Sequence, residues 1–252
     1  MTIVLLGIIG LVIGTVVILF GGGGAAIYLG ILTGIFGLNA SAAASTSLVT
    51  VLPSLIMGTW QYHRQGQIDA KLGNQMLVTA IPAVVIGSLC SRFIPGWIYK
   101  WLIGLILIAL GLNMLIQQFQ SKKTTDTNPS KTGHAKLKAG LYGVLGGLMV
   151  GVAGMSGGAV ILAGLLLLGL KAFDATATST YVLVFMTAVG TLFHIAGGQV
   201  DWHAGLPLMI GAFVGAVIAP LISIRLAKTK ATGYMKPVIG VFLAVLGVKS
   251  LF

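Results

Sequence analysis

The chain has 252 residues, of which 57% are hydrophobic and only 8% are charged, and its formal net charge is +11. A soluble domain carries about 25% charged residues because all of its faces meet water. This composition therefore excludes a soluble globular protein and predicts an integral helical membrane protein, whose basic loops contact anionic lipid heads rather than nucleic acid.

The chain contains eight apolar segments, most of them long enough to cross a membrane core of about 30 Å. The segments of the first half cover residues 3–36, 41–62, 72–92 and 97–119, and those of the second half cover residues 139–169, 175–197, 204–226 and 235–252. We expect a first transmembrane repeat at 1–120, a polar, basic linker at 121–138 and a second transmembrane repeat at 139–252.

The two halves resemble each other in sequence. Thr46-Ser47 recurs as Thr178-Ser179, and Gly66–Asp69 recurs as Gly198–Asp201, in both cases 132 residues later. Internal duplication of an apolar chain is typical of secondary transporters. Each half is therefore predicted to be one repeat, with a glycine-broken first helix or helical hairpin followed by three transmembrane helices.

The first segment of each half is too long for one span, since residues 139–169 as a single helix would measure about 45 Å. Either the segment is one kinked helix, or the chain turns back at its glycines as a re-entrant hairpin or a pair of short crossings. With turning back, 12 of the 15 basic residues share one side; with a single crossing the split is 8 to 7. Because Lys and Arg concentrate on the cytoplasmic side, we predict inverted repeats with a cytoplasmic linker and both termini outside.

Glycine clusters interrupt these first segments at matched positions, Gly21–Gly24 and Gly154–Gly158. Consecutive glycines weaken a helix and let the backbone leave it. A helix that restarts at membrane depth would direct its positive end and free N–H groups inward, where an anion could bind. The alternative is that these glycines only allow helices to pack closely.

The next segment of each half begins with small hydroxyl residues, after Asn39 in the first half and Asp174 in the second. Asn39 and Asp174 are predicted to be helix N-caps. The hydroxyls that follow could donate to an oxyanion, although Ser and Thr also bond to the preceding turn or to a neighbouring helix. Further hydroxyl and amide residues, Ser54 and Gln61 among them, are predicted to share one face of the first of these helices and to line a cavity.

His194 is a candidate for proton coupling, because an ionisable group in a membrane segment is often functional and histidine titrates near neutral pH. A helix-anchoring role is an equal alternative. Gly154-x-Ser156-Gly157 together with His194 also resembles the dyad of rhomboid intramembrane proteases. The first half has Gly22 where Ser156 stands in the second, so we expect no enzyme here.

The chain contains no glutamate and no P-loop, and a cation carrier would be expected to place a carboxylate in its path. The single cysteine, Cys90, excludes a cysteine metal cluster. We therefore expect no cofactor and no metal, and a small anion as the substrate, with carbonyl coordination of a cation as the alternative.

The glycine clusters, the Ala-x-Thr-Ser helix starts and the Gly-x-Ψ-Asp turns, in this order and duplicated, resemble the sulfite exporter TauE/SafE family of membrane permeases over nearly the whole chain. The chain departs from the family pattern at Tyr28-Leu29 and Leu162-Ala163, where a proline often follows the glycine cluster. The resemblance implies export of sulfite, sulfonates or related small anions, coupled to the proton gradient.

We accordingly predict a multi-pass carrier of a small oxyanion in a bacterial or archaeal cell membrane, working by alternating access. A passive anion channel and a hydrolase at Ser156 are the alternatives, and the oligomeric state is left open. The predicted substrate-binding residues are Gly22, Gly23, Gly24, Ser45, Thr46, Ser47, Gly154, Ser156, Gly157, Gly158, Thr178 and Ser179. The predicted residues for proton coupling or cavity lining are His194, Gln61 and Ser54.

Overall fold

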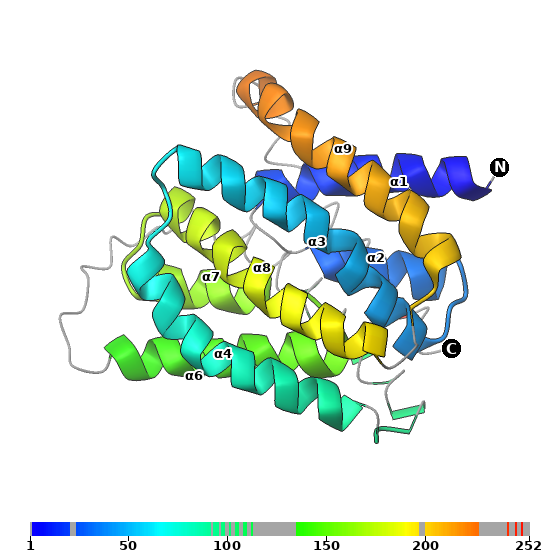
Figure 1. Ribbon diagram of the computed structural model, residues 1–252, viewed down its shortest axis with the longest axis horizontal. Helices are drawn as coiled ribbons and strands as arrows, with labels where there is room; N and C mark the ends of the chain where they lie inside the picture. The colour runs from blue at the N-terminus through cyan, green and yellow to red at the C-terminus, as the bar shows by residue number, and fades with distance from the viewer. Residues whose placement is uncertain are drawn as a thin grey trace.

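The computed structural model describes residues 2–20, 24–91, 93–95, 97–98, 135–196 and 200–226, together with isolated residues between 101 and 112 and between 241 and 248. Its elements are the helices α1 (Thr2–Phe20), α2 (Gly24–Gly34), α3 (Ala40–Arg64), α4 (Ala70–Ser91), α6 (Ala135–Ala153), α7 (Gly158–Leu167), α8 (Ala172–Ala196) and α9 (Trp202–Leu226) (Figure 1). Within these ranges every element is a helix, which confirms the all-α prediction.

Four of these helices are long and apolar enough to cross a membrane: α3, α4, most of α8 and the first part of α9. Each of the two long first segments forms two helices, as predicted from its glycine cluster. Residues 3–36 contain α2 and most of α1, and residues 139–169 contain α7 and most of α6. The helix α6 begins at Ala135, four residues inside the expected linker. Most of the linker and of segments 97–119 and 235–252 lies outside the described residues.

The helices of the two halves interlock. The helix α1 packs along α9, α4 packs along α6, and α3 and α8 lie side by side in the middle (Figure 1). In sequence, α1 corresponds to α6, α3 to α8 and α4 to α9. Exchanging the two halves therefore turns the α1–α9 contact into the α6–α4 contact and leaves the α3–α8 contact unchanged. The described helices of the two halves therefore pair with each other in matching ways.

Glycines allow the two outer helix pairs to touch backbone to backbone. A Cβ atom at Gly10 would overlap the carbonyl oxygen of Leu208 on α9, and a Cβ atom at Gly143 would lie 2.6 Å from the carbonyl oxygen of Met76 on α4. Gly10 and Gly143 are at matched positions, as are Leu208 and Met76. Helices that approach this closely pack tightly without large side chains between them.

The central helices α3 and α8 run in opposite directions. Near one end of the pair, Ser45 contacts His194. Near the other, a Cβ atom at Gly58 would lie 3.5 Å from Cγ2 of Thr180. Equivalent helices of the two halves are thus antiparallel in the middle of the molecule (Figure 1).

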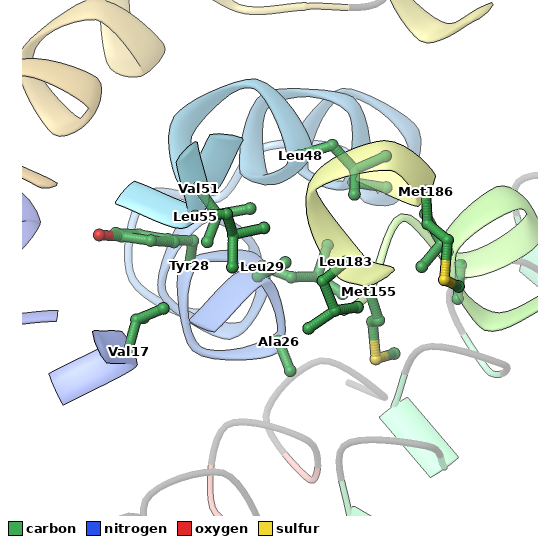
Figure 2. Packing of buried hydrophobic residues seen from close by; sticks show 14 of the residues in the cluster. Val17, Ala26, Tyr28, Leu29, Leu48, Val51, Leu55, Met155, Leu183 and Met186 are labelled. Atoms are coloured by element: carbon green, nitrogen blue, oxygen red, sulfur yellow. The ribbon is translucent and has the colours of Figure 1, made fainter. Parts of the chain in front are cut away.

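The core lies between α2, α3, α8 and the α6–α7 connection. Fully buried side chains from both halves form one cluster there, among them Tyr28, Leu29, Leu55, Met155 and Leu183 (Figure 2). The outward surface is also apolar, and the exposed large hydrophobic side chains include Val78, Leu192 and Ile210. An apolar exterior around an apolar core fits a protein whose outer solvent is lipid.

Candidate functional site

The chain leaves the helical conformation between α6 and α7. Gly154 has a φ of +62°, and the N–H groups of Gly154 and Met155 donate to the carbonyls of Val150 and Met149 at 3.1 and 3.4 Å. The bond from the Gly154 N–H to the carbonyl four residues before it is that of the αL motif, in which a left-handed glycine ends a helix. A Cβ atom at Gly154 would lie 2.8 Å from the backbone of Ala44 on α3, so both conformation and space require glycine here.

The residues Gly154–Gly158, which we call the break, are all buried. After them the chain turns back, since Gly157 lies against Gly146 and Gly164 lies against Tyr142 of α6. Met155 is 0% exposed and Ser156 is 3% exposed. A non-helical backbone is therefore enclosed by protein near the centre of the molecule, which is the environment such a backbone needs at membrane depth.

The matching turn of the first half is described only from Gly24, because Gly22 and Gly23 lie outside the described residues. The Tyr28 hydroxyl donates to the carbonyl of Gly10 at 3.2 Å, and Gly24 lies against Val17. The helix α2 therefore runs back along α1, as α7 runs back along α6.

Two serines at matched positions hold the two ends of the break. The Ser47 hydroxyl donates to the carbonyl oxygen of Gly154 at 2.9 Å, and the Ser179 hydroxyl donates to the carbonyl oxygen of Gly158 at 3.4 Å. Both serines are 0% exposed. One serine comes from each half, so the break is hydrogen-bonded to α3 at its start and to α8 at its end.

The first turn of α7 presents N–H groups at the break. The Gly158 N–H donates to Oγ of Ser156 at 3.2 Å. In the described part of the chain the N–H groups of Gly157 and Ala159 have no acceptor. Unpaired N–H groups at the positive end of a helix can bind an anion.

Thr46 and Thr178, predicted to contact substrate, also have protein partners. Oγ1 of Thr46 accepts the N–H of Asp201 at 2.9 Å, and Oγ1 of Thr178 accepts the N–H of Asp69 at 2.9 Å. Each threonine thus holds the turn before a helix of the other half. Substrate binding by these two residues stays a prediction.

His194 is 4% exposed and its Nδ1 lies 3.1 Å from Oγ of Ser45. The matching residue of the first half, Tyr62, donates its hydroxyl to the carbonyl of Ile18 at 2.9 Å. The two halves therefore differ here: one carries a titratable imidazole, and the other a tyrosine that bonds to a helix end.

The remaining predicted positions belong to helix starts and helix packing. Asn39 caps α3, since its Oδ1 accepts the Ala42 N–H at 2.7 Å, as predicted. The prediction for Asp174 is wrong: α8 begins at Ala172, and Asp174 lies in its first turn, where a carboxylate is favoured by the helix dipole. Ser54 and Gln61 donate to carbonyls of α9 at 2.9 and 3.4 Å; cavity lining by these two stays a prediction.

Buried hydroxyls without a hydrogen-bond partner among the described residues lie on α3, α4 and α8. The hydroxyls of Thr59 and Ser88 are buried and have no hydrogen-bond partner among the described residues, and the same holds for Thr187 and Thr191. Thr59 and Thr191 are 132 residues apart, the same spacing as the repeated Thr-Ser pair. Applying this spacing to every polar residue of the apolar segments would have found Thr59 and Thr191 as a pair.

The family described as Sulfite exporter TauE/SafE matches residues 6–250. Among relatives, the chain is 26% identical to probable membrane transporter protein YdhB of Bacillus subtilis, with 84% of each chain covered, and 26% identical to probable membrane transporter protein YunE of the same species, with 91% of each covered. It is 23% identical to probable membrane transporter protein YfcA of Escherichia coli, with 86% of this chain and 78% of the relative covered.

Proposed function

The chain belongs to the sulfite exporter TauE/SafE family, and on this premise we propose that it exports a small oxyanion, such as sulfite or an organosulfonate, across the cell membrane. Transport is by alternating access and is coupled to the proton gradient. The observation that carries the proposal is the break, a buried and unwound segment gripped by Ser47 of one half and Ser179 of the other.

The chemistry at the break favours an anion. The N–H groups of Gly157 and Ala159 are available at the start of α7, and the Ser156 hydroxyl lies beside them. The chain has no glutamate. Oδ1 of Asp69 and of Asp201 accepts an N–H in the first turn of α4 and α9, at 3.0 and 3.1 Å. N–H and hydroxyl donors suit sulfite or a sulfonate better than a metal cation.

The arrangement of the helices supports inverted repeats. Equivalent helices α3 and α8 are antiparallel, and α7 has 10 residues, which span about 15 Å, or half of a 30 Å membrane core. A helix of this length returns only part of the way across, as a re-entrant hairpin does. In this arrangement the linker is cytoplasmic and the termini are outside, in keeping with the 12 to 3 distribution of basic residues.

Proton coupling is assigned to His194. Its imidazole is buried against Ser45, and histidine is the side chain whose ordinary pKa lies nearest to neutral pH. Binding of an oxyanion nearby would favour the protonated imidazole, so that proton and anion move together.

The test is uptake of radiolabelled sulfite and a panel of sulfonates into proteoliposomes, with and without an imposed pH gradient. The proposal expects saturable flux that increases with the proton gradient. Flux that does not saturate would favour the passive channel, and no flux of any anion by inserted protein would overturn the proposal.

An intramembrane hydrolase at Ser156 is the weaker alternative. Oγ of Ser156 accepts a hydrogen bond from the N–H of Gly158. The histidine that a dyad would use is His194, and its Nδ1 contacts Oγ of Ser45. The relatives compared above are named as membrane transporters. Ser156→Ala separates the two functions, because it would abolish hydrolysis but only weaken transport.

A further inference from the structure

We propose that Thr46 and Thr178 are the latches of two gates, one at each end of the transport site, and that their release exposes the site to opposite sides of the membrane. The first latch is Oγ1 of Thr46 with the N–H of Asp201, and the second is Oγ1 of Thr178 with the N–H of Asp69. The inference rests on the proposed alternating access.

The two latches are equivalent in detail. Both hydrogen bonds measure 2.9 Å, and both threonines are fully buried. Each threonine methyl also lies against the first turn of the helix that begins just after its aspartate partner. A Cβ atom at Gly205 of α9 would be 3.2 Å from Cγ2 of Thr46, and one at Gly73 of α4 would be 3.4 Å from Cγ2 of Thr178. Gly73 and Gly205 are again 132 residues apart. The same device is therefore built twice.

The latches lie at opposite ends of the central helix pair. Thr46 is in the first two turns of α3 and Thr178 is in the first two turns of α8, and these helices are antiparallel. Each latch also joins one half of the chain to the other. Opening the first latch separates α3 from the turn before α9, and opening the second separates α8 from the turn before α4, each at one end of the molecule only, which is the geometry that alternating access requires.

Each latch threonine is followed in the chain by a serine that donates a hydrogen bond to the break. Ser47 follows Thr46 and grips the start of the break, while Ser179 follows Thr178 and grips its end. In both Thr-Ser pairs the threonine holds the turn of the opposite half and the serine holds the transport site. Movement of a latch is therefore transmitted directly to one end of the site.

A latch made of one neutral hydrogen bond can open at little cost, unlike the glycine contacts of the outer pairs. Along α4 and α6, Cβ atoms at Gly143 and Gly147 would overlap or press on backbone atoms of Met76 and Ala80. Such continuous backbone contact moves as one body. The hydrogen bonds to the N–H groups of Asp69 and Asp201 can instead exchange with water when α8 and α3 move away from these turns.

The test uses one reporter thiol, Ser156→Cys, in a Cys90→Ala background, labelled by a membrane-impermeant methanethiosulfonate in right-side-out and inside-out vesicles. Thr46→Val should raise the labelling rate from one side only, and Thr178→Val from the other side only. Each increase should be about fivefold, as expected for loss of one hydrogen bond of ordinary strength. Increases on the same side, on both sides or on neither would overturn the proposal.

Thr79→Val is the matched control. Its hydroxyl also lies between two halves, donating to the carbonyl of Gly140 at 3.0 Å, but within the α4–α6 pair. Labelling of this variant should match the parent from both sides, and so should that of Thr46→Ser and Thr178→Ser, which keep the hydroxyl. One-sided exposure caused by Thr79→Val would count against the latches.

Disulfides give a second measurement if the valine variants fail to insert. The pairs are Thr46→Cys with Gly205→Cys and Thr178→Cys with Gly73→Cys. A Cβ atom at each glycine would lie 3.2 and 3.4 Å from Cγ2 of the threonine, so a cysteine sulfur at the Cγ2 position can reach its partner. Oxidation of each pair should stop reporter labelling from its own side and reduction should restore it; unchanged labelling would overturn the proposal. Labelling needs no transported anion, so absence of sulfite flux would refute the proposed substrate without affecting this result.

Discussion

Replacing Gly154 by alanine tests whether the geometry of the break is required. The residue has a φ of +62°, where an alanine is strained by about 1–2 kcal/mol. Its new methyl group would also press on the backbone of Ala44, 2.8 Å away, and overpacking of this kind typically costs about 1–3 kcal/mol. The two effects together predict a destabilisation of about 2–5 kcal/mol.

Gly66→Ala is the matched control for this substitution. Gly66 has a φ of +69°, but a Cβ atom there would meet nothing within 4 Å. It should therefore show the backbone strain alone, about 1–2 kcal/mol. Unfolding in detergent by heat or denaturant measures both variants. Equal losses of stability at the two glycines would refute the close packing of the break against α3.

Three further predictions concern transport. Gly157→Val should abolish flux while the protein still inserts, because the side chain would meet the backbone of Gly146 at 2.5 Å; normal flux would exclude the break as the site, and surface labelling checks insertion. Ser156→Ala should lower the apparent affinity for the anion by about fivefold, for one lost hydrogen bond, and complete loss of activity would instead favour a hydrolase. His194→Gln should keep downhill flux but remove its acceleration by a pH gradient; a His194→Gln protein that still responds to the gradient would move proton coupling elsewhere.

The sequence was sufficient for the all-helical class, the division of both first segments and the capping of α3 by Asn39. These features follow from local composition: apolar length, glycine clusters and a polar cap. The error at Asp174 has the same origin, because an acidic residue before an apolar run is equally compatible with the first helical turn. The start of a helix is decided by a few backbone hydrogen bonds, which spacing alone does not resolve.

The partners of the repeated residues could not be read from the sequence. Spacing showed that Thr46 and Thr178 correspond, but not that each bonds to a turn of the opposite half. Likewise, nothing local to Gly143 indicates that α4 is its neighbour. Contacts between distant segments depend on how whole helices pack, and hydrophobic composition is nearly the same on every face of a helix that contacts both protein and lipid.

The pairing of α1 with α9 has a consequence for synthesis of the protein. The glycine face of α1 packs on Leu208 and Ala212, which emerge from the ribosome about 200 residues later. Protein synthesis adds about 5–20 residues per second, so α1 is in the bilayer for roughly 10–40 s before α9 has been synthesised. The N-terminal half is therefore an unfinished product rather than an independently stable domain, and truncated chains should be targets for membrane proteases and chaperones until the last helices arrive.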